Sequence, residues 1–171
     1  MQWNQTYGGE NNDSGYDLIE TSDGGYLIVG STASFGNGGD DAWLIKVDAQ
    51  GNMIWNQTYG GDLNEVGYSV IESHDGNFLI VGSTFSFGNG EENVWLVKVD
   101  SLGNMLWNQT YGEDGNESGW GIIGLPNENY SIVGYKEPFG SQMSDVWLIT
   151  VDENGDMLWE KTYGGSIVDY G

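Results

Sequence analysis

The stretch Trp55–Gly61, with the sequence WNQTYGG, decides the fold because it recurs along the chain. The same seven residues stand at Trp3–Gly9, six of them stand at Trp107–Gly112, and an altered form, WEKTYGG, stands at Trp159–Gly165. Neighbouring copies are 52 residues apart each time, so the chain is a tandem array without insertions or deletions between copies. A fixed period of this length indicates a repeat architecture.

Each repeat reads as four short strands. The four β-prone runs of the first repeat are Tyr16–Thr21, Tyr26–Gly30, Ala42–Val47 and Met53–Tyr59. Residues 22–25, Ser-Asp-Gly-Gly, separate the first two runs, and an Asp-Gly pair between such runs is a strong hairpin signal. Four antiparallel strands in about 52 residues make one blade of a β-propeller. We therefore predict an all-β propeller fold with three four-stranded blades and an extra N-terminal outer strand.

The repeat also predicts how the chain is divided. The whole chain, 1–171, is one array with a spare outer strand and loop at 3–14, blades at 15–66 and 67–118, and a third blade with the truncated start of a further repeat at 119–171. These limits suggest a piece of a longer array, natural or engineered. Three blades are fewer than the four to eight that usually close a propeller. We therefore expect two copies to pair head to tail as a homodimer with six blades.

The middle strands of each repeat are apolar on both sides. Leu27 and Val29 point to one face of the predicted sheet and Ile28 to the other, which requires both faces to be covered. Tryptophans that recur at fixed repeat positions are then better explained as packing between blades than as ligand platforms. They form two sets, Trp43, Trp95 and Trp147 in the third strands and Trp55, Trp107 and Trp159 in the fourth.

Three segments carry a resemblance to a known family. They are Asp48-x-x-Gly-Asn-x-x-Trp55, Asp100-x-x-Gly-Asn-x-x-Trp107 and Asp152-x-x-Gly-Asp-x-x-Trp159. They resemble the tryptophan-docking motif of quinoprotein-like propellers, with one residue fewer between Asp and Trp. The full unit, with DGGYLIVG and WLIKVD, resembles the repetitive propeller repeats of archaeal and bacterial cell-surface proteins. This resemblance implies that the fourth-strand tryptophan packs against the neighbouring blade, and that the parent protein is extracellular or at the cell surface.

Composition narrows the classes of function. The chain has 26 acidic residues against four lysines, a net charge of −22, so a nucleic-acid partner is not expected. It has no cysteine for a disulfide or a thiolate metal site. No apolar run approaches the roughly 20 residues that span a bilayer, and no signal peptide precedes the first repeat. Basic proteins, glycans and cations remain as partners.

The loop before each first strand carries an acidic residue in every copy. These residues are Asp13, Glu65, Glu117 and Asp169. A ring of carboxylates at the channel mouth is a weak candidate for calcium binding. The favoured alternative is that each carboxylate accepts hydrogen bonds from backbone N–H groups of its own loop. We predict no other cofactor.

A second set of candidates consists of the loop phenylalanines Phe35, Phe87 and Phe139. In a lectin-like propeller, sugars would stack on these rings, and exposed rings would favour that function whereas buried rings would remove it. We find no acid–base pair, nucleophile or metal cluster that stands apart from the repeat, so no catalytic residue is predicted. The expected function is a non-catalytic scaffold that presents an acidic loop face for protein binding or surface adhesion.

Overall fold

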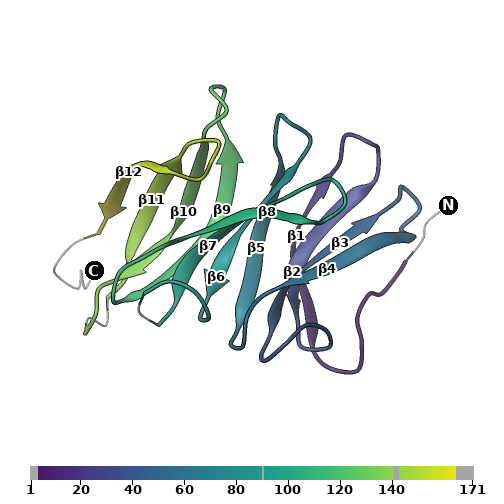
Figure 1. Ribbon diagram of the computed structural model, residues 1–171, viewed down its shortest axis with the longest axis horizontal. Helices are drawn as coiled ribbons and strands as arrows, with labels where there is room; N and C mark the ends of the chain where they lie inside the picture. Colours follow the sequence, from purple (N-terminus) through teal and green to yellow (C-terminus); the bar gives the residue numbers. More distant parts are fainter. Residues whose placement is uncertain (1–3, 90, 141–142, 165–171) are drawn as a thin grey trace, which may run out of the picture.

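The computed structural model describes residues 4–89, 91–140 and 143–164, and these contain twelve β-strands and no helix (Figure 1). The first sheet contains β1 (Asp13–Glu20), β2 (Tyr26–Thr32), β3 (Asp41–Val47) and β4 (Met53–Tyr59). The second sheet contains β5 (Glu65–Glu72), β6 (Phe78–Thr84), β7 (Asn93–Val99) and β8 (Met105–Tyr111). The third sheet contains β9 (Asn116–Gly124), β10 (Tyr130–Glu137), β11 (Asp145–Val151) and β12 (Met157–Tyr163).

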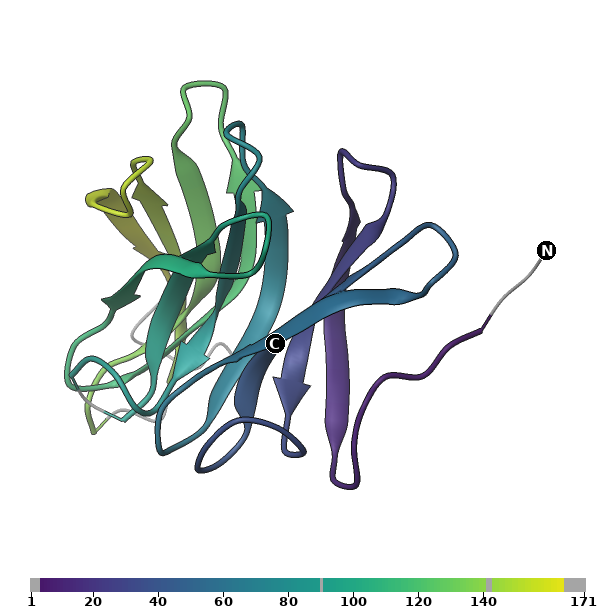
Figure 2. The same ribbon diagram turned by 45° about the vertical axis from the view of Figure 1, so that its right-hand side comes forward.

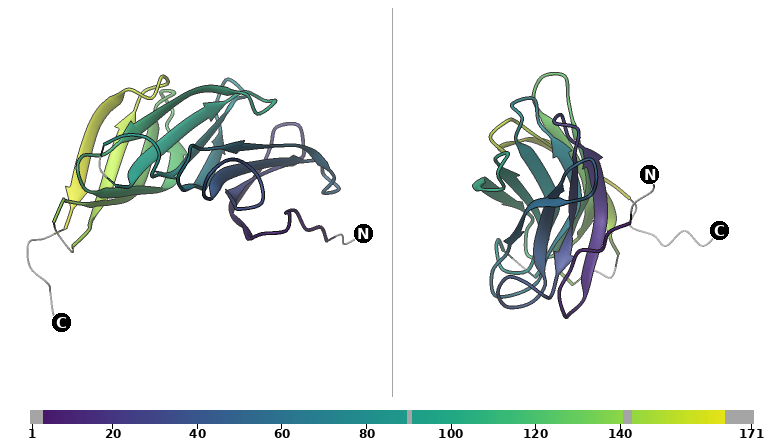
Figure 3. Two further views of the ribbon diagram at one scale, coloured as in Figure 1. Left: turned by 60° about the horizontal axis from the view of Figure 1, so that its bottom comes forward. Right: turned by 90° about the vertical axis from the view of Figure 1, so that its right-hand side faces the viewer.

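All pairings within the three sheets are antiparallel and join strands that follow one another in the chain. The prediction of three four-stranded blades is therefore confirmed. The sheets stand side by side as a fan, and Figure 3 shows that this fan is not closed into a ring. Residues 165–171, which hold the predicted start of a further repeat, lie outside the described residues. Among the described residues there is no helix that is long and apolar enough to cross a membrane.

The expected extra N-terminal strand is not formed in the described residues. Residues 4–12 have no strand structure, and Figure 2 shows them running along the outer side of the first sheet. The physical reason is that a fourth strand pairs with the third strand of its own blade, and this chain provides no third strand for that segment. Trp3 lies outside the described residues.

The blades pack against one another through the two faces of their middle strands. Leu27 and Val29 of β2 are fully buried in one cluster with Ile80 of β6 and Trp95 of β7. The same arrangement recurs one blade later, where Trp147 joins the cluster formed on the second blade. The predicted coverage of both sheet faces, and the packing role of these third-strand tryptophans, are confirmed for both junctions.

A glycine in each first strand allows this close approach. A Cβ atom built on Gly67 would lie 2.5 Å from Cγ2 of Val29, and one built on Gly119 would lie 2.7 Å from Cγ2 of Val81. Real Cβ atoms do not approach other carbons so closely. The valine of one blade therefore fits into a socket that exists because the next blade has glycine there.

The fourth strands of the first two blades dock on the next blade. Tyr59 at the end of β4 donates from its hydroxyl to the carbonyl oxygen of Gly103 at 2.8 Å, and a Cβ on Gly103 would lie 3.0 Å from the Trp55 ring. Tyr111 and Trp107 make the same contacts with Gly155, where the hydrogen bond is 2.7 Å. The tryptophan docking implied by the resemblance is thus present at both junctions.

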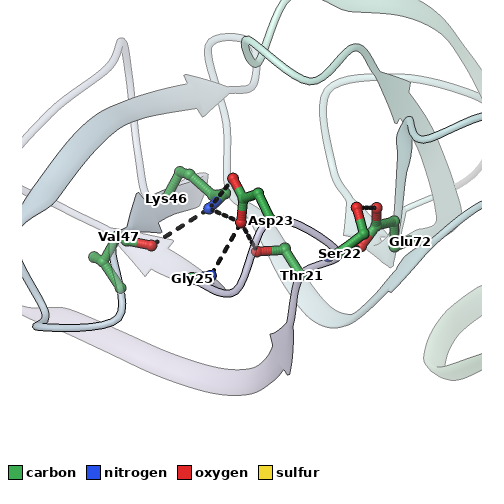
Figure 4. Close-up of polar contacts among 7 residues, drawn as sticks. All are labelled: Thr21, Ser22, Asp23, Gly25, Lys46, Val47 and Glu72. Atoms are coloured by element: carbon green, nitrogen blue, oxygen red, sulfur yellow. Dashed lines mark hydrogen bonds and ion pairs between the residues drawn. The ribbon is translucent and has the colours of Figure 1, made fainter.

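Each of the first two blades also has a buried lysine under its first hairpin. Lys46 Nζ on β3 lies 2.9 Å from each carboxylate oxygen of Asp23 in the β1–β2 turn, and Asp23 accepts the hydroxyl of Thr21 (Figure 4). These two interactions hold the pKa of Asp23 down at about 2, with the Thr21 hydrogen bond as the largest cause. In the same turn, Ser22 donates to Glu72 of the second blade and so ties the two blades together (Figure 4).

Candidate functional site

The acidic residues that begin the first strands are held by hydrogen bonds within their own blades. Glu65 is fully buried at the start of β5, and its carboxylate accepts Gly61 N at 2.6 Å, Thr84 Oγ1 at 2.8 Å and Ser86 N at 3.0 Å. One carboxylate thus connects the loop before β5 to the loop after β6. The alternative of loop hydrogen bonding is confirmed at this position.

Asp13 is bonded in the same way in the first blade. It accepts Gly9 N at 2.8 Å, Ser34 Oγ at 2.8 Å and the hydroxyl of Thr32. Burial by itself would raise the pKa of Asp13, but the donors outweigh burial and hold the pKa below its ordinary value. The hydrogen bonds of the loop therefore stabilise the charged form of Asp13.

Glu117 is the exception, because the third blade has lost two of the three donors. Lys136 stands where the second blade has Thr84, and Pro138, which has no N–H, stands where it has Ser86. Glu117 is fully buried, and both of its carboxylate oxygens lack a hydrogen-bond partner among the described residues. Burial raises the pKa of this carboxyl above its ordinary value, although the backbone N–H of Glu113 and the charge of Lys136 act in the opposite direction. The acidic position is retained in the third blade although its bonding is not.

A second acidic residue approaches Glu65 across the junction between the first and second blades. A Cβ on Gly60 would lie 2.1 Å from Asp41 Oδ1 and 2.6 Å from Glu65 Oε2, so both carboxylates converge on one glycine. Burial, and then the charge of Glu65, raise the pKa of Asp41.

The carboxylates do not gather into a metal centre in the part of the chain that the structure describes. No group of three or more His, Cys, Asp or Glu side chains there is placed to hold a metal ion. The predicted calcium candidates Asp13, Glu65 and Glu117 belong to separate blades, and Asp169 lies outside the described residues. Calcium binding by these residues stays a prediction.

The loop phenylalanines fall into two groups. Phe35 and Phe87 are 43% and 40% exposed, and their rings lie 5.5 and 5.6 Å from the rings of Trp43 and Trp95. Each ring thus forms a cap on its tryptophan and is partly open to solvent. Phe139 is 80% exposed. The rings are thus not buried, which keeps the glycan-binding alternative open.

The third blade replaces the phenylalanine cap by a lysine. Lys136 Nζ lies 4.9 Å from the Trp147 ring centroid, a distance at which a cation is attracted to the ring face. It also lies 3.4 Å from Glu113, which stands where the second blade has Gly61. A Cβ on Gly61 would come within 3.3 Å of the Phe87 ring, so the side chain of Glu113 crowds the place that a phenylalanine cap needs.

The two end faces of the fan are open. Val133 of β10 is 44% exposed, whereas the equivalent Val29 and Val81 are fully buried. Val146 of β11 is 51% exposed, whereas the equivalent Ala42 and Val94 are buried. At the other end, Leu18 of β1 is 60% exposed, although its equivalent in the second blade, Val70, is buried. These apolar side chains are exposed because this chain provides no further blade to cover them.

The first blade also has an unfilled socket. Gly15 is equivalent to Gly67 and Gly119, but the nearest atom to a Cβ built on it is Cγ2 of Ile28 in its own blade, at 3.5 Å. A cavity of about 100 Å³ lies beside it, lined by Gly15, Ile28, Trp43 and Tyr7 among others. Sequence reasoning missed this socket. The signal that could have revealed it is the glycine two residues after the acidic position in every blade.

No protein-family model matches this chain, and no curated protein matches it.

Proposed function

We propose that this chain is a non-catalytic propeller scaffold, which completes its ring by head-to-tail association with a second copy. The ring presents its acidic loop face to a basic protein partner or at a cell surface. The observation that carries the proposal is the match between the two ends of the fan. One end has an exposed valine, Val133, and the other has an empty socket at Gly15.

The junctions inside the chain provide the template for this contact. Val29 fills the socket at Gly67, and Val81 fills the socket at Gly119. Repeating the same step once more places Val133 of one copy in the socket at Gly15 of the next copy. An interface of this head-to-tail kind forms a ring when the rotation between copies closes. Two copies give six blades, which lies within the four to eight that usually close a propeller.

Charge and exposure support the role of the loop face. The net charge of −22 favours basic partners and disfavours contact with nucleic-acid phosphates. The resemblance of the repeats to those of cell-surface proteins supports an extracellular parent protein. A second candidate function, glycan binding, is favoured by one observation, the 80% exposure of Phe139.

The test is the solution mass of the folded protein. We expect sedimentation velocity to give twice the 18.7 kDa mass of the chain at micromolar concentration, with and without millimolar calcium. Val133→Asp should return a folded monomer, because a charge would enter an apolar socket. Leu106→Asp, at a position on β8 that is 51% exposed and away from the end faces, is the matched control and should remain a dimer.

Three results would count against the proposal. A folded wild-type monomer at 100 μM, or a dimer that persists in Val133→Asp, would overturn head-to-tail closure. A dimer that forms only with calcium would show that the loop carboxylates, and not the end faces, drive the association. For the glycan alternative, binding to a panel of oligosaccharides that is lost in Phe139→Ala would support that function instead.

A further inference from the structure

One tyrosine contact recurs three times, and one of the three is made by the N-terminal segment. Tyr59 and Tyr111 end β4 and β8 and donate to the carbonyl oxygens of Gly103 and Gly155 on the following blades. Tyr7 donates in the same way to the carbonyl oxygen of Gly51 on the first blade, at 2.6 Å. The segment that comes before the first blade thus uses the docking position that a preceding blade would use.

The N-terminal segment also covers the apolar surface beside this carbonyl. Tyr7 packs against the buried cluster of Trp43, Ile45 and Val47. In the second blade the equivalent Trp95 and Val97 are covered by the first blade together with Tyr59. The segment therefore supplies part of the cover that a whole blade supplies at the other junctions.

The matching strand at the far end of the chain has nothing to dock on. Tyr163 and Trp159 of β12 are 54% and 45% exposed, whereas Tyr59 is 6% exposed. Alternation along a strand places Trp159, Lys161 and Tyr163 on the same face. This is the face that in β4 carries Trp55, Gln57 and Tyr59 against the next blade.

The charge on that face of β12 also fits the first blade. Gln57 lies over Gly103, which is in the turn that begins with Asp100. A Cβ atom built on Gly103 would be 2.9 Å from Cγ of Gln57. Lys161 takes the place of Gln57 in β12. Docked equivalently on the first blade, its ammonium group would approach the turn that begins with Asp48, in a protein that is otherwise strongly acidic.

We propose that the surface around Gly51 is the docking site for β12 of a second copy, and that residues 4–9 occupy this site as a competitor. This inference rests on the proposed head-to-tail closure. Tyr7 and the partner's Tyr163 use the same carbonyl oxygen and cannot both be seated on it. Only the fraction of molecules in which residues 4–9 have left the site can bind a second copy, so the segment weakens the apparent affinity by that fraction.

The test compares dimer affinities of the full chain and its variants by sedimentation equilibrium. Tyr7→Ala frees the site, so we expect its dimer dissociation constant to fall by at least about tenfold. Tyr163→Ala removes the docking side chain and should raise the constant by at least about tenfold. Leu158→Ala, on the opposite face of β12, is the matched control and should leave the constant unchanged. Tyr7→Phe keeps the ring but loses the hydroxyl, and should lie between Tyr7→Ala and wild type.

A second measurement distinguishes displacement of residues 4–9 by the second copy from a purely structural role of Tyr7. Amide hydrogen exchange of residues 4–9 should become faster as the protein concentration is raised through the dissociation constant, because the dimer displaces them. Unchanged exchange, or a Tyr7→Ala dimer that is no tighter than wild type, would overturn the competition. If Val133→Asp still abolishes the dimer in that case, the closure itself stands. If every variant is a monomer, both proposals fail.

Discussion

At the scale of single residues, Glu65 and Glu117 occupy the same place in two blades but have opposite surroundings. The carboxylate of Glu65 accepts three hydrogen bonds, whereas both oxygens of Glu117 are without partners among the described residues. Removing an acceptor from buried donors destabilises the fold, whereas removing a buried charge that has no hydrogen bond relieves a cost. The same substitution at the two positions should therefore have opposite signs.

We predict that Glu65→Gln lowers the free energy of unfolding by about 1–3 kcal/mol, because the amide nitrogen faces donors that need an acceptor. Glu117→Gln should raise it by about 1 kcal/mol at pH 7, since a buried charge is removed and no bond is lost. The pKa of Glu117 is raised in the fold, so wild type loses stability as the pH rises above the ordinary carboxyl pKa. The gain in stability of Glu117→Gln over wild type should therefore vanish at pH 4. Urea unfolding at both pH values measures this, and equal losses in the two variants would contradict it.

The acidic positions and their bonds to N–H groups of their own loops could be predicted from the sequence, but their other hydrogen bonds could not. The repeat places an acid before every first strand, and the hydrogen bonds of Asp13 and Glu65 agree with the favoured prediction. The remaining donors come from the end of the second strand and the loop after it, about 20 residues away, and only the fold brings these segments together. The loss of donors at Glu117 could be inferred from the sequence only after the structure had shown that Thr84 and Ser86 donate to Glu65.

At the scale of elements, the buried lysine links a middle strand to the hairpin of its blade. Lys46 pairs with Asp23 and Lys98 pairs with Asp75. In the third blade both partners are replaced, by Thr150 on β11 and by Asn127 in the turn. Thr150 there shares a hydrogen bond of 2.9 Å with Ser131 on β10. The pair has thus been lost as a unit, which is expected if either partner alone is unfavourable.

We predict that Lys46 and Asp23 are energetically coupled. Asp23→Asn leaves a buried ammonium group without its counter-ion and should destabilise the protein by about 1–3 kcal/mol, because an uncompensated buried charge is costly. The double variant Lys46→Thr with Asp23→Asn should be less destabilised than the sum of the two single variants by about 1 kcal/mol. Chemical unfolding of the four proteins at pH 7 gives this coupling, and simple additivity would refute it.

The same pair should respond to acid. The pKa of Asp23 is lowered to about 2, so its contribution is present above the ordinary carboxyl pKa and is lost as the pH falls toward 2. Asp23→Asn has no such group to titrate. Its free energy of unfolding should therefore approach that of wild type over this pH range.

The strands themselves were predictable because the same pattern of β-prone runs and turn residues recurs in each repeat. The predicted fourth strand, Met53–Tyr59, has the bounds of β4, and the second and third strands begin at or within one residue of the predicted positions. The first strand begins three residues earlier than predicted, at Asp13, because the acid and the serine after it pair with Thr32 and Ser31. The extra N-terminal strand was predicted wrongly, since a sequence motif does not show whether its partner strand is present.

At the scale of the whole molecule, the net charge of −22 opposes compact structure and association alike. The described residues contain only three ion pairs between side chains to offset this repulsion. Repulsion among exposed carboxylates has a range of about 30 Å at 0.01 M salt and about 10 Å at 0.1 M. Added salt should therefore act on the molecule as a stabiliser.

We predict that the thermal midpoint rises by several degrees when sodium chloride is increased from 10 mM to 500 mM, because screening removes more repulsion than attraction. Circular dichroism at a dilution where the protein is monomeric measures this without interference from assembly. Potassium chloride is the control for a specific ion effect and should give the same rise. A flat or falling midpoint would show that the acidic residues do not repel one another appreciably.

Each sheet is completed by consecutive strands, β1 to β4 first, then β5 to β8 and β9 to β12, and no strand of the described residues passes from one sheet to another. A ribosome making about 5–20 residues per second therefore releases a whole sheet every few seconds. Backbone pairing in the nascent chain never has to wait for a distant segment. What the first and second sheets lack on emergence is side-chain cover on one face, and the next sheet to be synthesised supplies it.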